Sequence, residues 1–375
     1  MDRMPELHTN AGGSPVPFDP LVPYNDLPLV PPAEDLETKE VLKKCISAHR
    51  ALAELKGAGQ TIPNQGMLIN TLVLQEARSS SEIENIVTTD DAVFQALATS
   101  GSADPAIKEV LRYREAIKDA FESVSQRPLL STNLFVRIAQ TIRENQAGIR
   151  NVPGTAIRNL RTGAIVYTPP EGEGIIRDKL RNLEEYIHNE NGVDHLVKLA
   201  VVHYQFEAIH PFTDGNGRTG RIINILFLVQ RGLLELPVLY LSKYIIEKKS
   251  DYYRLLREVT QSGDWESWIL YMLDAIEQTA LHTRRKIQAI RRLLDQTLRE
   301  AKEKVPSRVY SKDLVELLFF QPYTKVQYLV EAGIAKRQTA SEYLKQLERV
   351  GLLIPRPSGK EKLYLNQRLL DLLSS

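Results

Sequence analysis

The spacing of apolar residues along the chain predicts a mostly α-helical protein. Between about residues 37 and 298, apolar side chains recur every three to four positions, the period of a helix with one buried face. A first helix is expected to run through Val41 and Leu55, and a second from Met67 to the polar stretch at Ser79. Further helices are expected at 105–123, 131–145, 174–187, 194–209, 219–230, 251–260 and 265–293.

Two segments depart from the helical period. Residues 1–36 are rich in proline and contain a glycine pair, which predicts an extended arm laid over the surface of the domain. Residues 154–170 read GTAIRNLRTGAIVYTPP, and their apolar residues, Leu160 among them, flank the turn Arg161-Thr162-Gly163. This pattern predicts a β-hairpin that the two prolines close.

The C-terminal part reads as a small separate unit. A charged helix is expected to end near Lys304, and Pro306 then marks a linker. After it come two short helices, a sharp turn at Gly333, a third helix and two short strands, which is the order of a winged helix. The expected domains are therefore an arm at 1–36, a helical body with its hairpin at 37–298, and a winged helix-turn-helix domain at 305–375.

Composition adds few constraints. The formal net charge is +1, so no global field marks a nucleic-acid binder, and 43% hydrophobic with 25% charged residues is ordinary for a soluble globular protein. The single cysteine, Cys45, excludes an intramolecular disulfide, and the first residues lack the apolar core of a secretory signal. The most apolar stretch, 222–241, contains charged residues that would be costly in a bilayer. We expect a cytoplasmic protein with no membrane association.

The candidate chemistry lies in residues 210–221, which read HPFTDGNGRTGR. Pro211 disfavours helical geometry in the preceding residue, so a long apolar helix should end at His210, facing a loop. Glycines on both sides of Asn216 let backbone N–H groups turn toward an anion, and the next helix, expected to begin near Arg218, adds its dipole. Arg218 and Arg221 are three positions apart, share a helix face, and suit the phosphates of a nucleotide.

Two further residues of this loop suit phosphate chemistry. Asp214 is a reasonable ligand for a Mg²⁺ ion that bridges phosphate oxygens. His210 has an ordinary pKa that lets it take a proton from a hydroxyl near neutral pH. The alternative is a core histidine followed by a simple Asx-Gly turn. A chance combination of a base, an acid, an anion-binding loop and two arginines within twelve residues is rare, which favours the functional interpretation.

HPFTDGNGR with Arg221 resembles the signature of the Fic (filamentation induced by cAMP) family, HPFx[D/E]GN[G/K]RxxR, and matches every specified position. The similarity extends from about Glu37 to Ala280. It implies a Fic-type helical core and a protein adenylyltransferase, which transfers AMP from ATP to a Tyr, Thr or Ser hydroxyl of target proteins and of itself. His210 would be the base and Asp214 the Mg²⁺ ligand. The residues that would hold the phosphates are Gly215, Asn216, Gly217, Arg218 and Arg221.

The resemblance also assigns roles outside the loop. Doc-like kinases of the superfamily carry lysine where this chain has Gly217, which favours transfer of AMP over transfer of phosphate. The hairpin would be a flap that pairs with the backbone of the target segment, with Ile165, Val166 and Tyr167 as its edge. A hairpin that only covers the core is the alternative. Tyr252 and Tyr253 stand where related proteins contact the nucleotide, although adjacent tyrosines are as often ordinary packing.

Residues 80–85, SSEIEN, resemble the inhibitory motif [S/T]xxxE[G/N] of Fic proteins. Ser80 and Glu84 are four positions apart, so on a helix they share one face. The resemblance implies an inhibitory helix at about 79–87, in which Glu84, followed by Asn85, forms an ion pair with Arg221. The motif precedes the catalytic loop on the same chain, which is the class II arrangement. A solvated capping segment is the alternative.

Other functions stay open at this stage. Within the enzyme class, the nearest alternative is removal of AMP at the same site, with Glu84 positioning a water. A second class is a DNA-binding regulator that acts through the winged helix, which could equally bind protein. Its candidate cations are Lys336, Arg337, Lys345, Arg349, Lys360 and Lys362, interrupted by Glu342, Glu348 and Glu361. The sequence leaves open the target proteins, the modified hydroxyl, a homodimer, and the signal that relieves inhibition.

Overall fold

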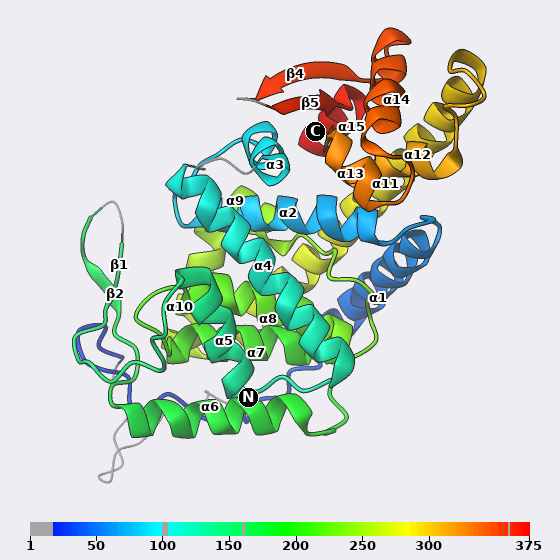
Figure 1. Ribbon diagram of the computed structural model, residues 1–375. Helices are drawn as coiled ribbons and strands as arrows, with labels where there is room; N and C mark the ends of the chain where they lie inside the picture. Colours follow the sequence, from blue (N-terminus) through cyan, green and yellow to red (C-terminus); the bar gives the residue numbers. More distant parts are fainter. Residues whose placement is uncertain (1–17, 100–103, 160–161, 359–360) are drawn as a thin grey trace, which may run out of the picture. The chain divides into compact units, whose positions relative to one another are not determined.

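The computed structural model describes residues 18–99, 104–159, 162–358 and 361–375, and it is mostly helical (Figure 1). Contacts between Cα atoms group the chain into two compact units. The first contains the described residues of Met1–His49, Glu122–Arg231 and Glu247–Glu277; the second contains those of Arg50–Phe121, Gly232–Ile246 and Gln278–Ser375. Three of the five boundaries fall within α1 (Lys39–Gln60), α4 (Pro105–Gln126) and α11 (Trp265–Lys304).

In the first unit, α7 (His195–Ile209) and α8 (Asn216–Gln230) lie side by side, as Figure 1 shows. Around them are α5 (Thr132–Arg143), α6 (Glu173–His188) and α10 (Lys249–Ser262). Nearly every residue of α7 is buried, as expected for a helix that is apolar on all sides. The two central helices approach closely at Gly220, where a Cβ atom would lie 2.5 Å from the Glu207 Oε1 atom.

The proline-rich arm runs in extended form over the first unit. Its backbone N–H at Tyr24 donates to the Thr168 carbonyl (3.0 Å), and its N–H at Val30 donates to the Asn182 amide oxygen (2.9 Å). The side chains of Leu27 and Val30, which belong to the arm, are buried. The described part of the arm therefore lies on the domain surface, as predicted; residues 1–17 are outside the described residues.

The hairpin pairs β1 (Ile157–Arg158) with β2 (Ile165–Tyr167) in antiparallel orientation. The register places Ile157 opposite Tyr167 and Arg158 opposite Ile165. Gly163 in the turn has a φ of 72°, which a glycine adopts without strain. Leu160 and Arg161, expected in this hairpin, lie outside the described residues. The hairpin that the sequence predicts is confirmed, while its role as a flap stays a prediction.

The second unit contains α2 (Gly66–Ile83), α3 (Asp90–Ala98) and α9 (Leu241–Glu247) together with the C-terminal elements. These are α12 (Lys312–Leu317), β3 (Tyr323–Thr324), α13 (Val326–Glu331), α14 (Arg337–Arg349), β4 (Ile354–Ser358), β5 (Glu361–Leu365) and α15 (Gln367–Ser374). The three strands form an antiparallel sheet in the order β3-β5-β4. The element order from α12 to β5 agrees with the expected winged helix.

Several expectations about helices need correction. The helix expected to begin near Arg218 begins at Asn216, because Gly215 has a φ of 85° and is the N-cap. The helix expected to end near Leu293 continues to Lys304 without a break. The pattern missed α3, α9 and α15, whose seven to nine residues are too few for a clear period. Among the described residues, no helix combines the length and apolarity needed to cross a bilayer.

Candidate active site

His210 occupies the end of α7 in a left-handed backbone conformation. Its φ and ψ are 49° and 59°, and its N–H donates to the Phe206 carbonyl at 3.1 Å as the C-cap of the helix. Left-handed geometry is uncommon in a residue with a side chain and turns the chain sharply out of the helix. Pro211 follows directly, so the helix cannot continue. The histidine is half-buried and faces the loop, as predicted.

Arg150, which sequence reasoning missed, fixes this end of α7. It is 3% exposed, its Nε donates to the His210 carbonyl at 2.8 Å, and its N–H donates to the Pro211 carbonyl at 2.9 Å. Its guanidinium also donates to the carbonyls of Ile209 (3.4 Å) and Pro170. Burial lowers the pKa of Arg150, yet an arginine stays charged at neutral pH. One cation thus caps the helix and joins His210 to the base of the hairpin.

Asn216 braces the loop from within. Its side-chain oxygen accepts from the Phe212 N–H at 2.8 Å, and its side-chain nitrogen donates to the Phe212 carbonyl at 2.7 Å. The chain then enters α8 through Gly215. The first N–H groups of a helix have no partner within it, so a braced loop at this point suits an anion.

Two buried arginines add positive charge at the start of α8. Arg218 and Arg221 are each 2% exposed. Arg221 also acts on His203, whose pKa falls to about 3 through burial first and the neighbouring guanidinium second. Both guanidinium groups therefore lie in a region of low water content, where interactions between charges are screened least.

The two candidate tyrosines occupy different surroundings. Tyr252 is 2% exposed, its hydroxyl lies 2.9 Å from the His203 Nε2 atom, and burial raises its pKa well above the ordinary value. Tyr253 is 45% exposed. Tyr252 is thus part of the packed interior beside Trp268, and only Tyr253 presents its ring to solvent. Nucleotide contact by either tyrosine stays a prediction.

Asp214 lies on the exposed side of the loop. Its side chain is 49% exposed, with one oxygen paired to Arg143 and the other 3.6 Å from the Arg218 Nη2 atom and 2.5 Å from the Gly215 N–H nitrogen. Mg²⁺ usually binds proteins through one or two carboxylates plus substrate phosphates, and one carboxylate beside an anion site fits that donor set. The described residues hold no cluster of three acidic, His or Cys groups that would bind a metal alone.

The hairpin is anchored next to His210 through Tyr167. The Tyr167 hydroxyl donates to the Ala208 carbonyl at 2.8 Å, and its ring stacks on Phe18 with centroids 6.0 Å apart. Its side chain therefore points into the protein. Ile165 and Val166 are partly exposed. Of the three predicted edge residues, Tyr167 anchors the hairpin through its side chain, and its backbone is part of β2.

The motif at residues 80–85 forms the end of α2. Ser80 is fully buried on the last turn, Glu84 is the exposed C-cap, and Asn85 turns the chain with a φ of 64°. Glu84 belongs to the second unit and Arg221 to the first, so their ion pair stays a prediction.

Three family models match the chain in succession. They are the Fic/DOC family N-terminal model at residues 42–122, the Fic/DOC family model at 129–228, and the protein adenylyltransferase SoFic-like C-terminal domain at 293–369. The middle match contains His210 and the whole loop. The chain belongs to the Fic family.

Relatives within this family share modest identity with the chain. A probable protein adenylyltransferase of Aquifex aeolicus is 28% identical over 180 residues, which cover 47% of this chain and 54% of the relative. A protein adenylyltransferase of Caenorhabditis elegans is 30% identical over 108 residues, 28% of this chain and 20% of the relative. The Fic adenylyltransferase of Drosophila virilis is 30% identical over 212 residues, which cover 56% of this chain and 39% of the relative. The chain thus spans between a fifth and about half of these relatives' lengths.

Solved structures support the Fic fold. A Fic family protein from Desulfovibrio desulfuricans G20 superimposes with a TM-score of 0.54 at 19% identity, covering 89% of this chain and 98% of that one. A C. elegans Fic structure gives a TM-score of 0.51 at 18% identity, with coverage of 66% and 73%. At such identities the likeness concerns the fold alone.

Proposed function

We propose that this chain is a protein adenylyltransferase that transfers AMP from ATP to a Tyr, Thr or Ser hydroxyl of target proteins and of itself. One observation carries the proposal. His210, turned out of α7 and held by Arg150, stands at the entrance of a braced anion site whose first helical turns contain the buried Arg218 and Arg221. The adenylyltransferase names of the relatives agree with it.

The proposed chemistry is a displacement at the α-phosphorus of ATP. His210 accepts the proton of the incoming hydroxyl, whose oxygen then bonds to the α-phosphorus. The bond from that phosphorus to the bridging oxygen breaks, and pyrophosphate leaves with the electron pair. Gly215, Asn216, Gly217 and Arg218 hold the α- and β-phosphates, and Arg221 holds the γ-phosphate. Because the loop is braced before ATP arrives, little reorganisation is needed in the transition state.

Asp214 would hold the Mg²⁺ ion that ATP brings. The ion would neutralise charge that develops on the phosphates during transfer. Arg143, now paired with Asp214, would have to release that carboxylate, and its guanidinium would then be available to the nucleotide.

Two neighbouring devices complete the proposed enzyme. The hairpin edge at Ile165, Val166 and Tyr167 pairs with the backbone of the target, which fixes its position while tolerating varied side chains. The second device is the inhibitory motif, which consists of Ser80, Glu84 and Asn85. It inhibits transfer when the Glu84 carboxylate forms an ion pair with the Arg221 guanidinium.

Isotope placement in ATP tests the reaction class. The full chain and its Glu84→Gly variant are incubated with Mg²⁺ and ATP labelled at either the α- or the γ-phosphorus, followed by mass spectrometry. Label should enter protein from the α position only, with a mass increase of one AMP, and His210→Ala should not incorporate it. Transfer of the γ label would identify a kinase instead. Release of AMP from a modified target without any transfer would favour the removal reaction.

A further inference from the structure

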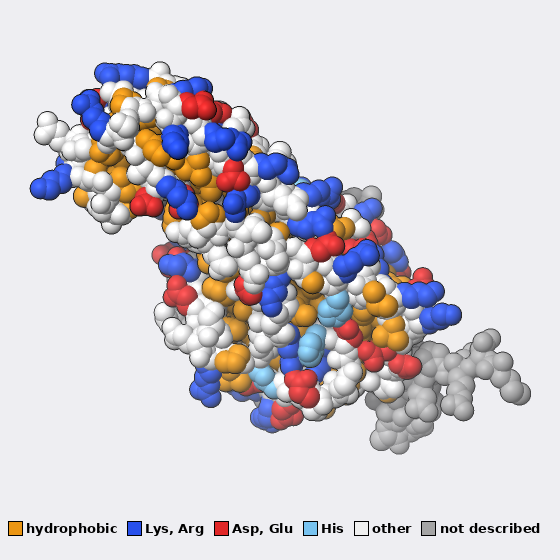
Figure 2. Space-filling view, turned by 90° about the vertical axis from the view of Figure 1, so that its right-hand side faces the viewer, with side chains coloured by type: hydrophobic (Ala, Val, Ile, Leu, Met, Phe, Trp, Pro, Cys, Tyr) orange, Lys and Arg blue, Asp and Glu red, His pale blue; other side chains and the backbone are white. Residues whose placement is uncertain are grey.

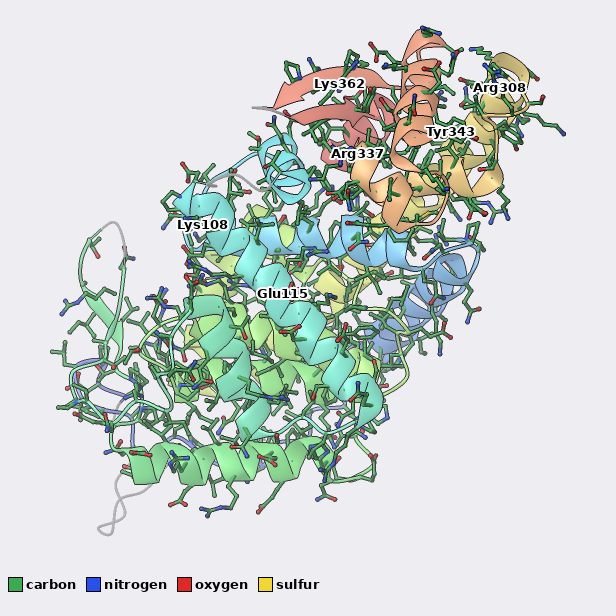
Figure 3. The ribbon with its side chains drawn as sticks, in the orientation of Figure 1. Lys108, Glu115, Arg308, Arg337, Tyr343 and Lys362 are labelled. Atoms are coloured by element: carbon green, nitrogen blue, oxygen red, sulfur yellow. The ribbon has the colours of Figure 1, made fainter. Side chains whose placement is uncertain are left out.

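A groove of about 840 Å³ lies beside the N-terminal half of α14 in the winged helix. One wall is α14 from Arg337 to Lys345, and the other is the segment of Arg308 and Val309 that precedes α12 (Figure 3). The Tyr343 hydroxyl donates to the Arg308 carbonyl at 2.9 Å, which fixes that segment against the helix. This hydrogen bond therefore joins the two walls of the groove.

The buried face of α14 is distinct from the positions that present Arg337 and Lys345 to the groove. The helix packs through Ala340, Leu344 and Leu347, which are 0%, 0% and 1% exposed. Arg337 and Lys345 are exposed on other sides of the helix. Hydroxyl and amide groups stand between them, from Gln338, Thr339 and Ser341.

Four cations of this domain that lie away from the groove pair with carboxylates: Lys312 with Glu316 (3.4 Å), Arg349 with Glu342 (4.0 Å), Lys362 with Glu348 (2.7 Å) and Arg368 with Glu300 (3.1 Å). In the part of the chain that the structure describes, no carboxylate pairs with Arg308, Arg337 or Lys345, which line the groove. Arg349 and Lys362, two of the cations expected to bind DNA, are thus neutralised; Lys360 lies outside the described residues.

Among the described residues, three cations without a carboxylate partner therefore line one groove. Its one carboxylate, Glu342, accepts from the Gln346 side chain at 2.8 Å and pairs with Arg349. Figure 2 shows Lys and Arg side chains predominating over Asp and Glu on one face of the winged-helix part. Unpaired cations that line one groove create a potential that attracts a polyanion.

We propose that this groove binds duplex DNA, with Arg308, Arg337 and Lys345 on phosphates and the first turn of α14 at the major groove. A helix about 10–12 Å wide matches a major groove about 12 Å wide. Arg337 and Lys345 are eight residues apart, or about 12 Å along the helix, so they reach different phosphates. Gln338, Thr339 and Ser341 supply groups that bond to phosphates and base edges.

The chemistry of the groove favours a nucleic acid over an acidic protein segment. Protein partners are usually anchored by apolar or aromatic side chains that fill dry pockets. Here three cations, amide and hydroxyl groups line the groove together with Glu342 and one aromatic residue, Tyr343, and Val309 is buried within the fold. Such a lining matches the regularly spaced charges of a duplex.

Fluorescence anisotropy of the full chain with a labelled duplex of mixed sequence tests the proposal across salt concentrations. Three phosphate contacts predict a log–log salt slope of about −3. The variant R308Q/R337Q/K345Q should bind more than tenfold more weakly at low salt and lose most of that slope. The matched variant K312Q/R349Q/K362Q removes the same number of charges from paired positions and should keep the slope. All six positions are at least partly accessible, and circular dichroism checks that both variants fold.

Three results would overturn the proposal. These are no anisotropy change with duplex, an equal loss in both triple variants, and competition by polyglutamate as strong as that by unlabelled duplex. The measurement needs no AMP transfer, so its outcome is independent of the proposed enzymatic function.

Discussion

At the level of single residues, His203 within α7 and His210 at the C-cap of that helix have opposite surroundings. His203 is fully buried between the Tyr252 hydroxyl and the Trp268 ring, and its pKa of about 3 keeps it neutral. His210, two turns later, is half-buried in the backbone turn that leads to the anion site. Of these two imidazoles, only His210 is placed to exchange a proton with a substrate.

Replacing His210 with alanine should remove nearly all AMP transfer. Loss of a general base costs about 10²–10⁴-fold in rate, and no other histidine lies in the loop. The matched control, His195→Ala at the opposite end of α7, should keep transfer close to the wild-type rate. Incorporation of α-labelled AMP, together with circular dichroism, measures the difference. A folded His210→Ala variant that transfers at the wild-type rate would exclude His210 as the base.

His203 should make the first unit sensitive to acid. Its pKa lies near 3 in the folded chain and near 6.5 when unfolded, so the unfolded chain takes up the proton first. The stability from neutral His203 is fully present above pH 6.5 and is lost as pH falls toward 3. Between pH 6.5 and 5 the loss should be about 2 kcal/mol.

Urea denaturation at the two pH values, monitored by tryptophan fluorescence, measures this loss of stability. Trp265 and Trp268 both belong to the first unit. His203→Gln keeps a polar partner for Tyr252 but cannot be protonated, so its stability should fall less between the two pH values. Identical pH dependence in the variant and the wild type would assign the acid sensitivity to other groups.

At the scale of elements, one arginine holds three segments together. Arg150 joins the end of α7, the loop at Pro211 and the base of the hairpin at Pro170. Arg150→Gln should leave buried carbonyls without donors and destabilise the protein by about 1–3 kcal/mol. It should also lower kcat more than tenfold with little change in the KM for ATP, because His210 loses its support while the phosphate site remains.

Steady-state kinetics below the unfolding temperature separates these effects. Arg177→Gln, on the exposed face of α6, is the matched control and should change neither quantity. If Arg150→Gln melts earlier but keeps the wild-type kcat, the residue stabilises the fold without positioning His210.

The last helix, α15, is fixed to α2 by a buried lysine of α11. The Lys286 ammonium, 8% exposed, donates to the carbonyls of Leu373 (2.8 Å) and Ser375 (3.0 Å), and Gln75 of α2 also donates to Leu373. A cation at a helix C-terminus satisfies carbonyls that lack intrahelical donors.

Lys286→Met should therefore loosen α15. Loss of about 1–2 kcal/mol of local stability predicts roughly tenfold faster amide hydrogen exchange across α15 at constant pH. Lys302→Met, on an exposed position of the same helix α11, is the control and should leave this exchange unchanged. Unchanged exchange in Lys286→Met would mean that apolar packing alone holds α15.

At the scale of the whole molecule, the two compact units carry the two halves of the proposed regulation. The catalytic loop belongs to the first unit and Glu84 to the second. Glu84→Gly should raise AMP transfer strongly, including onto the protein itself, because Arg221 loses its competing partner. A carboxylate attached to the fold competes with the γ-phosphate at high effective concentration. Inhibition then works by misaligning the α-phosphate, so kcat should change more than ATP affinity.

The double variant Glu84→Gly with Arg221→Ala tests the route of this activation. It should lose much of the gain, since the freed arginine is what activation uses. The matched control is Glu82→Gly. It removes a neighbouring carboxylate, which pairs with Arg78 at 3.1 Å. Equal activation in the single and double variants would show that Glu84 does not act through Arg221.

Features that depend on neighbouring residues were predictable from the sequence. Pro211 ends α7 at His210, Gly215 starts α8, and the spacing of Arg218 and Arg221 follows from the helical period. The hairpin and the order of the winged-helix elements follow from local patterns in the same way. Sequence reasoning therefore recovered the loop and most long helices, but not short helices that are defined by their caps.

Contacts between groups that are distant in the sequence depend on how the chain packs. Arg150 reaches a carbonyl sixty positions away, and Tyr252 reaches His203 across forty-nine. No local pattern encodes such partners, because they depend on how helices pack. The same holds for charge: Arg349 and Lys362 look like Arg337 and Lys345 in the sequence, but folding neutralises the first pair with carboxylates and leaves the second pair facing the groove or solvent. Packing, which fixes the distances between charges, determined that difference.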